Sequence, residues 1–240
     1  MLTTSPPARV EAATRVLAAS VTRALNSPDH PFPLARRVAE IGDDGGGPGA
    51  VRVVGADVLA PYLLGDRVPG HDDIEAVRAA VREFPAPPPA PHPDPVWAAR
   101  DWALVRALAV LGVDATEWEG VCAEAGDGSA DPGATGSEPW PTWAVGMARL
   151  STLALPHLEG ATRTQALARR TDLARGMARA MLRRDHHTAA RLARWLALDQ
   201  RSAPEPLLGS ALDHLALLGV DESRTALEIA LARRIAQPEH

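Results

Sequence analysis

Apolar residues recur at helical spacing along most of the chain, which predicts a largely α-helical protein. Residues 7–26 begin with Pro7, which suits a first helical position, and their apolar residues fall on one face: Val10, Leu17, Val21 and Leu25. A second amphipathic series follows Asp72 and Asp73, either of which suits an N-cap: Ile74, Val77, Val81 and Phe84.

From residue 96 onward, one predicted helix follows another. The predicted helices cover residues 96–111, 116–124, 140–155, 160–184, 186–199, 205–218 and 222–236. The first of them is apolar on nearly every side, which is typical of a buried helix. The expected fold is therefore mainly α, either a helical bundle or an irregular array of αα-hairpins.

A few segments depart from this helical pattern. Residues 51–59 carry two β-branched apolar runs interrupted by Gly55-Ala56-Asp57, which predicts a short β-hairpin. Residues 85–95 contain seven prolines and cannot continue a helix. They predict a semi-rigid connector between a smaller N-terminal portion (1–84) and a helical domain (96–240), with a Pro-rich recognition motif as the alternative. Residues 126–139 lack apolar periodicity and predict a mobile loop.

Two stretches of the chain resemble each other. Residues 106–114 and 213–221 both run from an apolar helix through Gly-Val-Asp. A glycine suits the end of a helix and an aspartate suits the start of the next one, so each stretch predicts a helix–turn–helix corner. The resemblance has two readings, a diverged duplication or the same helix-end pattern used twice.

The composition excludes several kinds of chemistry. The 240-residue chain contains no Lys and a single Cys, Cys122. Schiff-base and phosphate-loop lysines, internal disulfides and Cys-rich metal centres are therefore excluded. No apolar stretch has the length of a membrane span, and charged residues interrupt any signal-peptide pattern near the N-terminus, so a cytoplasmic protein is expected. The Ala, Arg, Pro and Gly richness is typical of a very GC-rich genome such as that of an actinobacterium, which suggests specialised metabolism as a setting.

Positive charge is concentrated late in the chain. Residues 160–201 carry ten Arg against three acids, a net charge of +7 in a protein whose formal charge is -5. Arg175, Arg179 and Arg183 are spaced four apart and lie along one helix face. Because a guanidinium presents planar, paired donors to carboxylate or phosphate, this pattern predicts a docking face for an anionic peptide, protein or small molecule. The residues assigned to it are Arg175, Arg179, Arg183, Arg184, Arg191 and Arg194.

An ordinary solvated helix face is the competing interpretation of these arginines. Nucleic acid is not the favoured partner, because the protein is acidic overall and lacks a recognised nucleic-acid-binding motif.

Histidines supply the candidate residues for catalysis. Asp185 is a predicted N-cap that places His186 and His187 in the first helical turn, where the positive helix end favours neutral imidazoles. His214 shares a stripe with Leu207, Ala211 and Leu218, which predicts an imidazole on an apolar face. Such a histidine is either a hydrogen-bonded core residue or a general base. The spacing matches no metal-binding motif, and no cofactor is predicted.

Six tryptophans stand out in a chain poor in aromatic residues: Trp97, Trp102, Trp118, Trp140, Trp143 and Trp195. They suit either core packing or the walls of a ligand pocket.

Two functions follow from these observations. The first is a binding protein that docks an anionic partner through its Arg face. The second is an enzyme without a cofactor, with a Trp-lined pocket and a His as general acid or base.

Overall fold

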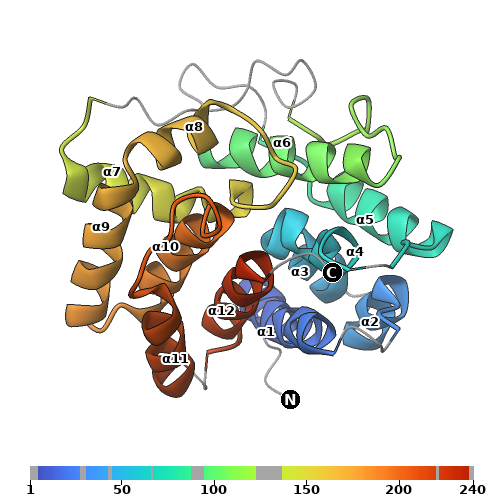
Figure 1. Ribbon diagram of the computed structural model, residues 1–240. Coiled ribbons are helices and arrows are strands. Elements are labelled where there is room, and N and C mark those ends of the chain that lie inside the picture. Colours follow the sequence, from blue (N-terminus) through green and yellow to red (C-terminus); the bar gives the residue numbers. More distant parts are fainter. Residues whose placement is uncertain are drawn as a thin grey trace. The chain divides into compact units, whose positions relative to one another are not determined.

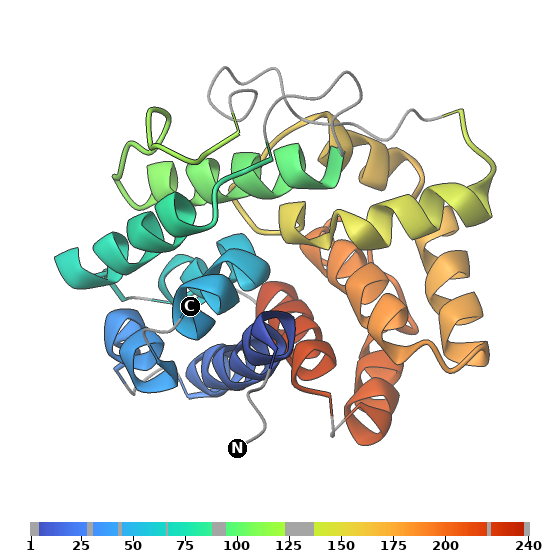
Figure 2. The same ribbon diagram turned by 180° about the vertical axis from the view of Figure 1, so that it is seen from behind.

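The computed structural model describes residues 5–27, 31–42, 45–65, 67–87, 95–122, 137–219 and 222–237. Every regular element in these ranges is a helix, which confirms the mainly α fold (Figures 1 and 2). The chain forms two compact units, Met1–Ala130 and Asp131–His240. No helix in the described ranges combines the length and the apolar character needed to cross a bilayer.

The N-terminal unit is built around α3. Its elements are α1 (Pro6–Asn26), α2 (Leu34–Ile41), α3 (Gly46–Val54), the 3-10 turn η1 (Gly55–Leu59), α4 (Ala60–Leu63), α5 (His71–Glu83) and α6 (Pro95–Val110). Helix α3 packs against α1, α2 and α5. A Cβ on Gly49 would lie 2.8 Å from a methyl group of Val10, so the glycine allows α1 and α3 to approach closely.

The β-hairpin predicted for residues 51–59 is wrong. These residues form the end of α3 and the turn η1, which meet at Gly55 with a φ of +67°. Val51, Val58 and Leu59 are all buried. A short apolar run that is buried on every side carries no periodicity, so the sequence pattern could not separate helix from strand.

The prediction that Asp72 or Asp73 is the N-cap of α5 is wrong, because this helix begins at His71 and both aspartates lie in its first turn. Gly70 is the N-cap, and Asp73 acts from the third helical position, where Oδ2 accepts from the Gly70 backbone N–H. The same carboxylate accepts from Tyr62 Oη and from the Ala35 backbone N–H. Asp73 therefore ties α5 to α2 and α4.

A buried ion pair joins α6 to α3. The Arg52 guanidinium donates to both carboxylate oxygens of Asp101, whose side chain is 0% exposed. Arg100 donates to the carbonyls of Arg52 and Val53. Helix α6 accordingly belongs to the N-terminal unit. The boundary between the two units lies after α6, between Ala130 and Asp131, and not at the predicted connector 85–95. Residues 88–94 of that connector and residues 126–136 of the predicted loop lie outside the described residues.

The predicted helix at 116–124 is absent from its described part, residues 116–122, which form turns. Asp114 does not cap a helix, because its Oδ1 accepts from the backbone N–H and the hydroxyl of Thr116 two residues ahead. The matching glycines also differ in conformation, since Gly112 has a φ of +81° and Gly219 a φ of -97°. The two similar stretches therefore form different corners.

The C-terminal unit is built around α10. Its elements are α7 (Trp140–Arg149), the 3-10 turn η3 (Ser151–Leu153), α8 (Ala161–Ala168), α9 (Arg170–Leu182), α10 (His186–Leu198), α11 (Leu208–Leu218) and α12 (Ser223–Ala236). Helix α10 packs against α7, α9, α11 and α12, and Figure 1 shows it running between α9 and α12. Nearly all of its residues from Ala189 to Ala197 are buried, and Trp195 Nε1 donates to the Met147 carbonyl at 2.8 Å.

Candidate ligand-binding groove

Of the arginines assigned to a docking face, Arg194 belongs to the core and Arg191 is half-buried beside it. The Arg194 side chain is 0% exposed, and its Nη1 donates to Glu228 Oε2 at 3.1 Å. Its Nε donates to the Ala154 carbonyl at 2.8 Å. Arg191 Nε donates to Oε1 of the same carboxylate at 3.3 Å. The assignment of Arg191 and Arg194 to an outer face is therefore wrong, because an internal carboxylate holds both.

The Glu228 carboxylate is ionised at the centre of this cluster. Burial by itself raises the pKa of Glu228, but the charges of Arg194 and Arg191 outweigh it and hold that pKa below the ordinary value. Ser151 Oγ also donates to Oε1 at 3.1 Å. The charges of Arg194 and Arg191 therefore serve the fold and are not available to a ligand.

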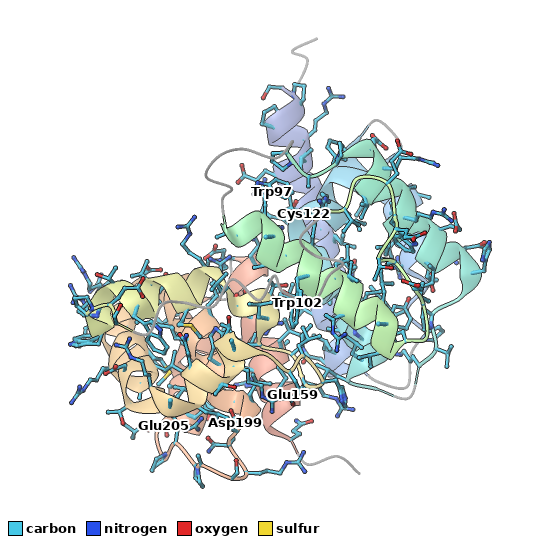
Figure 3. The ribbon with its side chains drawn as sticks, turned by 90° about the horizontal axis from the view of Figure 1, so that it is seen from above. Trp97, Trp102, Cys122, Glu159, Asp199 and Glu205 are labelled. Atoms are coloured by element: carbon cyan, nitrogen blue, oxygen red, sulfur yellow. The ribbon has the colours of Figure 1, made fainter. Side chains whose placement is uncertain are left out.

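Four further arginines of the 160–201 segment have partners within the unit. Arg163 pairs with Glu159 and Asp199, Arg169 and Arg175 pair with Asp172, and Arg170 donates to the Leu196 carbonyl. Figure 3 shows Glu159, Asp199 and Glu205 on the same side of the unit. Much of the positive charge that the sequence concentrates is thus balanced locally.

Arg179, Arg183 and Arg184 remain exposed near the C-terminal end of α9. None of these three side chains forms an ion pair or hydrogen bond with another residue of the described ranges. The Arg179 guanidinium lies over the Trp140 ring, 5.7 Å from its centroid. Arg175, Arg179 and Arg183 are all exposed, while Leu173 and Met177 on the opposite side of α9 are buried.

Arg179 and Arg183 line a groove formed by α7, α9 and the start of α10, with a volume of about 580 Å³. The remainder of its surface is mostly apolar, contributed by Trp140, Ala144, Val145, Gly176, Ala180 and Leu192. A groove of this size, with a few charged groups beside an apolar surface, is typical of ligand-binding sites. Arg175 and Arg184 do not line it.

The corner between α9 and α10 sets the position of the two groove arginines. Arg184 adopts a φ of +60° and ends α9, while the Asp185 backbone N–H donates to the Ala180 carbonyl. Asp185 Oδ1 then accepts from the Thr188 backbone N–H, which confirms Asp185 as the N-cap of α10. Asp185 lines the groove, and it is the acid among the lining residues.

Close helix packing forms the base of the groove. A Cβ on Gly176 would lie 2.7 Å from Ala144 Cβ and 3.1 Å from Leu192 Cδ1. The glycine therefore lets α9 approach α7 and α10 closely, while the longer side chains of Trp140 and Arg179 extend from the flanking positions.

His187 lies in a hydrogen-bonded chain away from the groove lining. Thr225 Oγ1 donates to Glu222 Oε2 at 2.7 Å, and His187 Nδ1 lies 3.1 Å from Thr225 Oγ1. Because the hydroxyl proton is directed to Glu222, Nδ1 carries the donated proton and Nε2 keeps its lone pair. Burial, followed by the charge of Arg191, lowers the pKa of His187, so a neutral imidazole in the first turn of α10 is favoured, as the sequence predicts.

His214 is not on a buried face. It is exposed, as are Leu207 (68%) and Leu218 (51%) of the predicted stripe. The buried side of α11 is formed instead by Leu208, Ala211, Leu212 and Leu215. The expectation of a desolvated imidazole at His214 is therefore wrong, because α11 begins at Leu208 and turns the neighbouring apolar face inward. His186 is half-buried.

The described tryptophans lie in different environments. Trp102, Trp143 and Trp195 are buried, and Trp140 is the tryptophan that lines the groove of the C-terminal unit. Trp97 and Trp118 lie in the N-terminal unit, where Arg52 and Arg78 contact their respective rings. Within the described residues, no group of three or more His, Cys, Asp or Glu side chains is arranged to hold a metal ion.

The sequence pattern did not reveal the apolar part of the groove. Ala144 and Leu192 are ordinary helix residues in the sequence, and only the packing of α7 on α9 and α10 brings them beside the arginines. Comparisons of the chain with protein-family models, with curated proteins and with solved structures found no match. The groove is therefore the basis for assigning a function.

Proposed function

We propose that the C-terminal unit is a binding module whose α7–α9–α10 groove takes an acidic peptide segment carrying a large apolar side chain. The observation that carries this proposal is the joint presence of Arg179, Arg183 and Trp140 in one groove. A segment of a partner protein that places carboxylates beside an aromatic or aliphatic side chain matches this combination of charge and apolar surface.

Charge supports an acidic ligand. Arg179 and Arg183 are exposed, and neither meets a carboxylate within the described part of the chain. Asp185 is the acid among the lining residues, and its Oδ1 is engaged at the α10 N-terminus. Two forked guanidinium groups in this setting favour carboxylates, which they can bind through paired hydrogen bonds.

The apolar surface supports a ligand with a side chain to bury. Val145 lines the groove and is 56% exposed. Aromatic residues and arginines are the groups that most often dominate binding energy at protein interfaces. An acidic peptide with a Leu or Trp therefore fits better than an inorganic anion.

The experiment is a titration of the full chain against a labelled peptide of alternating acidic residues around a central Trp, followed by fluorescence anisotropy. The double variant Arg179→Gln/Arg183→Gln is expected to bind at least about tenfold more weakly, because charge-assisted hydrogen bonds are lost. Arg175→Gln is the matched control, since Arg175 is exposed on the same helix face but does not line the groove.

Three results would overturn the proposal. They are equal affinity of the double variant and the wild type, equal loss in Arg175→Gln, and equal binding of a peptide whose acidic residues are replaced by Lys. Circular dichroism of each variant shows whether the helices are retained, so that a folding defect is distinguished from a loss of binding.

A second candidate function is catalysis by His187. The observation in its favour is the His187–Thr225–Glu222 chain, which presents a neutral imidazole with a basic Nε2. Reaction of the full chain with diethyl pyrocarbonate tests this candidate, because a general base must be reachable from solvent. If His187 stays unmodified while exposed His214 reacts, the catalytic role is excluded.

A further inference from the structure

We infer that a second site, in the N-terminal unit, binds a small organic oxyanion that carries an apolar group. The site is a cavity of about 480 Å³ lined by residues of α1, α2 and the first residue of α3. It is independent of the C-terminal groove, because its lining residues all come from the N-terminal unit. Its volume is within the range of small-molecule sites.

Three arginines line this cavity, Arg9 and Arg23 from α1 and Arg37 from α2. Arg9, Val16 and Arg23 occur at intervals of seven residues, so they lie along one face of α1. Glu40 is the acid among the lining residues. The lining therefore has an excess of positive charge, which favours an anionic ligand.

Neighbouring side chains hold Arg37 and Arg23 in place. Arg37 Nη1 donates to Glu40 Oε2 at 2.6 Å, and Arg23 Nη2 donates to Ser20 Oγ at 3.2 Å. Each guanidinium has five N–H donors, so these contacts orient the groups and leave further donors for a ligand. The hydrogen bonds from Arg37 and Arg36 lower the pKa of Glu40, which keeps this carboxylate ionised as their partner.

The start of α3 adds to the positive potential. Gly46, the first residue of this nine-residue helix, lines the cavity. The Gly47 N–H donates to the Gly42 carbonyl and Pro48 has no N–H, so the helix contributes through its dipole and the Gly46 amide. The N-terminal end of a helix carries a partial positive charge that attracts anions. This contribution reinforces the three arginines on the same cavity.

One wall of the cavity is apolar. Ala12, Ala13, Val16 and Ile41 line it, and Val16 is 53% exposed, whereas Leu17 and Val21 of the same helix are fully buried. Inorganic phosphate would leave this wall unused. A carboxylate or a phosphate monoester with a short hydrocarbon chain would use both the cationic and the apolar parts of the lining.

The test is a titration of the isotope-labelled full chain with hexanoate, hexyl phosphate and inorganic phosphate, followed through amide shifts in NMR spectra. Binding of hexanoate or hexyl phosphate, with shifts at the cavity residues, supports the inference. The tighter of the two identifies the anionic group. Inorganic phosphate is expected to bind more weakly than hexyl phosphate, because it lacks the apolar contact.

Matched variants locate the site. Arg37→Gln is expected to weaken hexyl phosphate binding by about tenfold. Ala12→Glu adds a carboxylate at an exposed helix position in the lining and is expected to prevent binding, whereas Ala12→Gln retains it. Arg15→Gln is the control on α1, since Arg15 is exposed outside the lining.

Several outcomes overturn the inference. They are the absence of shifts at the cavity residues with both organic anions, unchanged affinity in Ala12→Glu, and an equal loss in Arg15→Gln. Inorganic phosphate binding as tightly as hexyl phosphate would overturn the assignment of an apolar ligand. If Arg37→Gln fails to fold, the Ala12 pair decides the question, because its exposed position tolerates polar side chains.

Discussion

The Arg179 guanidinium lies 5.7 Å from the centroid of the Trp140 ring, which connects α9 to the first residue of α7. The ring covers one side of the cation and leaves its N–H edges for a carboxylate. This cation–π pair places the positive and apolar parts of the groove next to each other. A substitution at Trp140 can therefore be used to measure its effect on ligand binding separately from its effect on the stability of the unit.

Trp140→Leu is expected to weaken acidic-peptide binding while lowering the free energy of unfolding by only about 1 kcal/mol or less, the contribution of an exposed cation–π pair. Peptide anisotropy and urea denaturation measure the two effects. Trp118→Leu is the matched control, because Trp118 is half-buried and lies under Arg78 at 5.8 Å in the N-terminal unit. Loss of peptide binding in the control, or none in Trp140→Leu, contradicts the prediction.

Glu228→Gln is expected to lower the free energy of unfolding by about 3–5 kcal/mol, because Arg194 is left as an uncompensated buried charge. Urea denaturation of the full chain measures this loss. The variant Asp213→Asn breaks the Arg233–Asp213 pair, which is exposed and has an N–O distance of 2.7 Å, and it should cost much less.

Replacing both members of the buried pair provides a second check. The variant Arg194→Met/Glu228→Leu is expected to recover much of the stability lost in Glu228→Gln, because it removes the buried charges together. If the double replacement is as unstable as the single one, the loss arises from packing and not from the unpaired charge.

Gly176→Ala is expected to destabilise the protein by about 1–2 kcal/mol, because overpacking exceeds the gain in helix propensity. The new Cβ would lie 2.7 Å from Ala144 Cβ. Adding Ala144→Gly should relieve this clash, so a double-mutant cycle in urea is expected to show favourable coupling. If the stability losses of the two single variants simply add in the double variant, α7 and α9 accommodate the extra methyl group without a clash.

Stability is expected to fall on mild acidification because of His187. Burial and the charge of Arg191 lower its pKa from the ordinary 6.5. As the pH falls through 6.5, the unfolded chain takes up a proton that the folded chain does not, so the free energy of unfolding decreases until the pH is below the folded pKa.

Thermal unfolding of His187→Gln at about pH 7.5 and about pH 5.5 tests this prediction, because the variant should lose part of the pH dependence. His214→Gln is the comparison, since it removes an exposed imidazole. An unchanged pH dependence in His187→Gln would assign the effect to other groups.

Most helices could be predicted from the sequence because their apolar faces are periodic. Residues 7–26 match α1, and the predicted helix at 186–199 matches α10 including its Asp185 cap. The failures occur where periodicity is lost. Most residues of Val51–Leu59 are buried, and residues 116–122 form turns in which Asp114 accepts from Thr116.

The groove was predicted only in part. Arg175, Arg179 and Arg183 share an exposed face because α-helical geometry alone fixes their spacing. The sequence could not show which arginines pair with a carboxylate of the same protein. The Arg194–Glu228 pair, for example, joins residues 34 positions apart in the sequence. The setting in actinobacterial specialised metabolism stays a prediction.

Arg52 and Arg194 each find their carboxylate within their own unit, through Asp101 and Glu228 respectively. A substitution at Arg52 or Asp101 can therefore be compensated within the N-terminal unit, and one at Arg194 or Glu228 within the C-terminal unit.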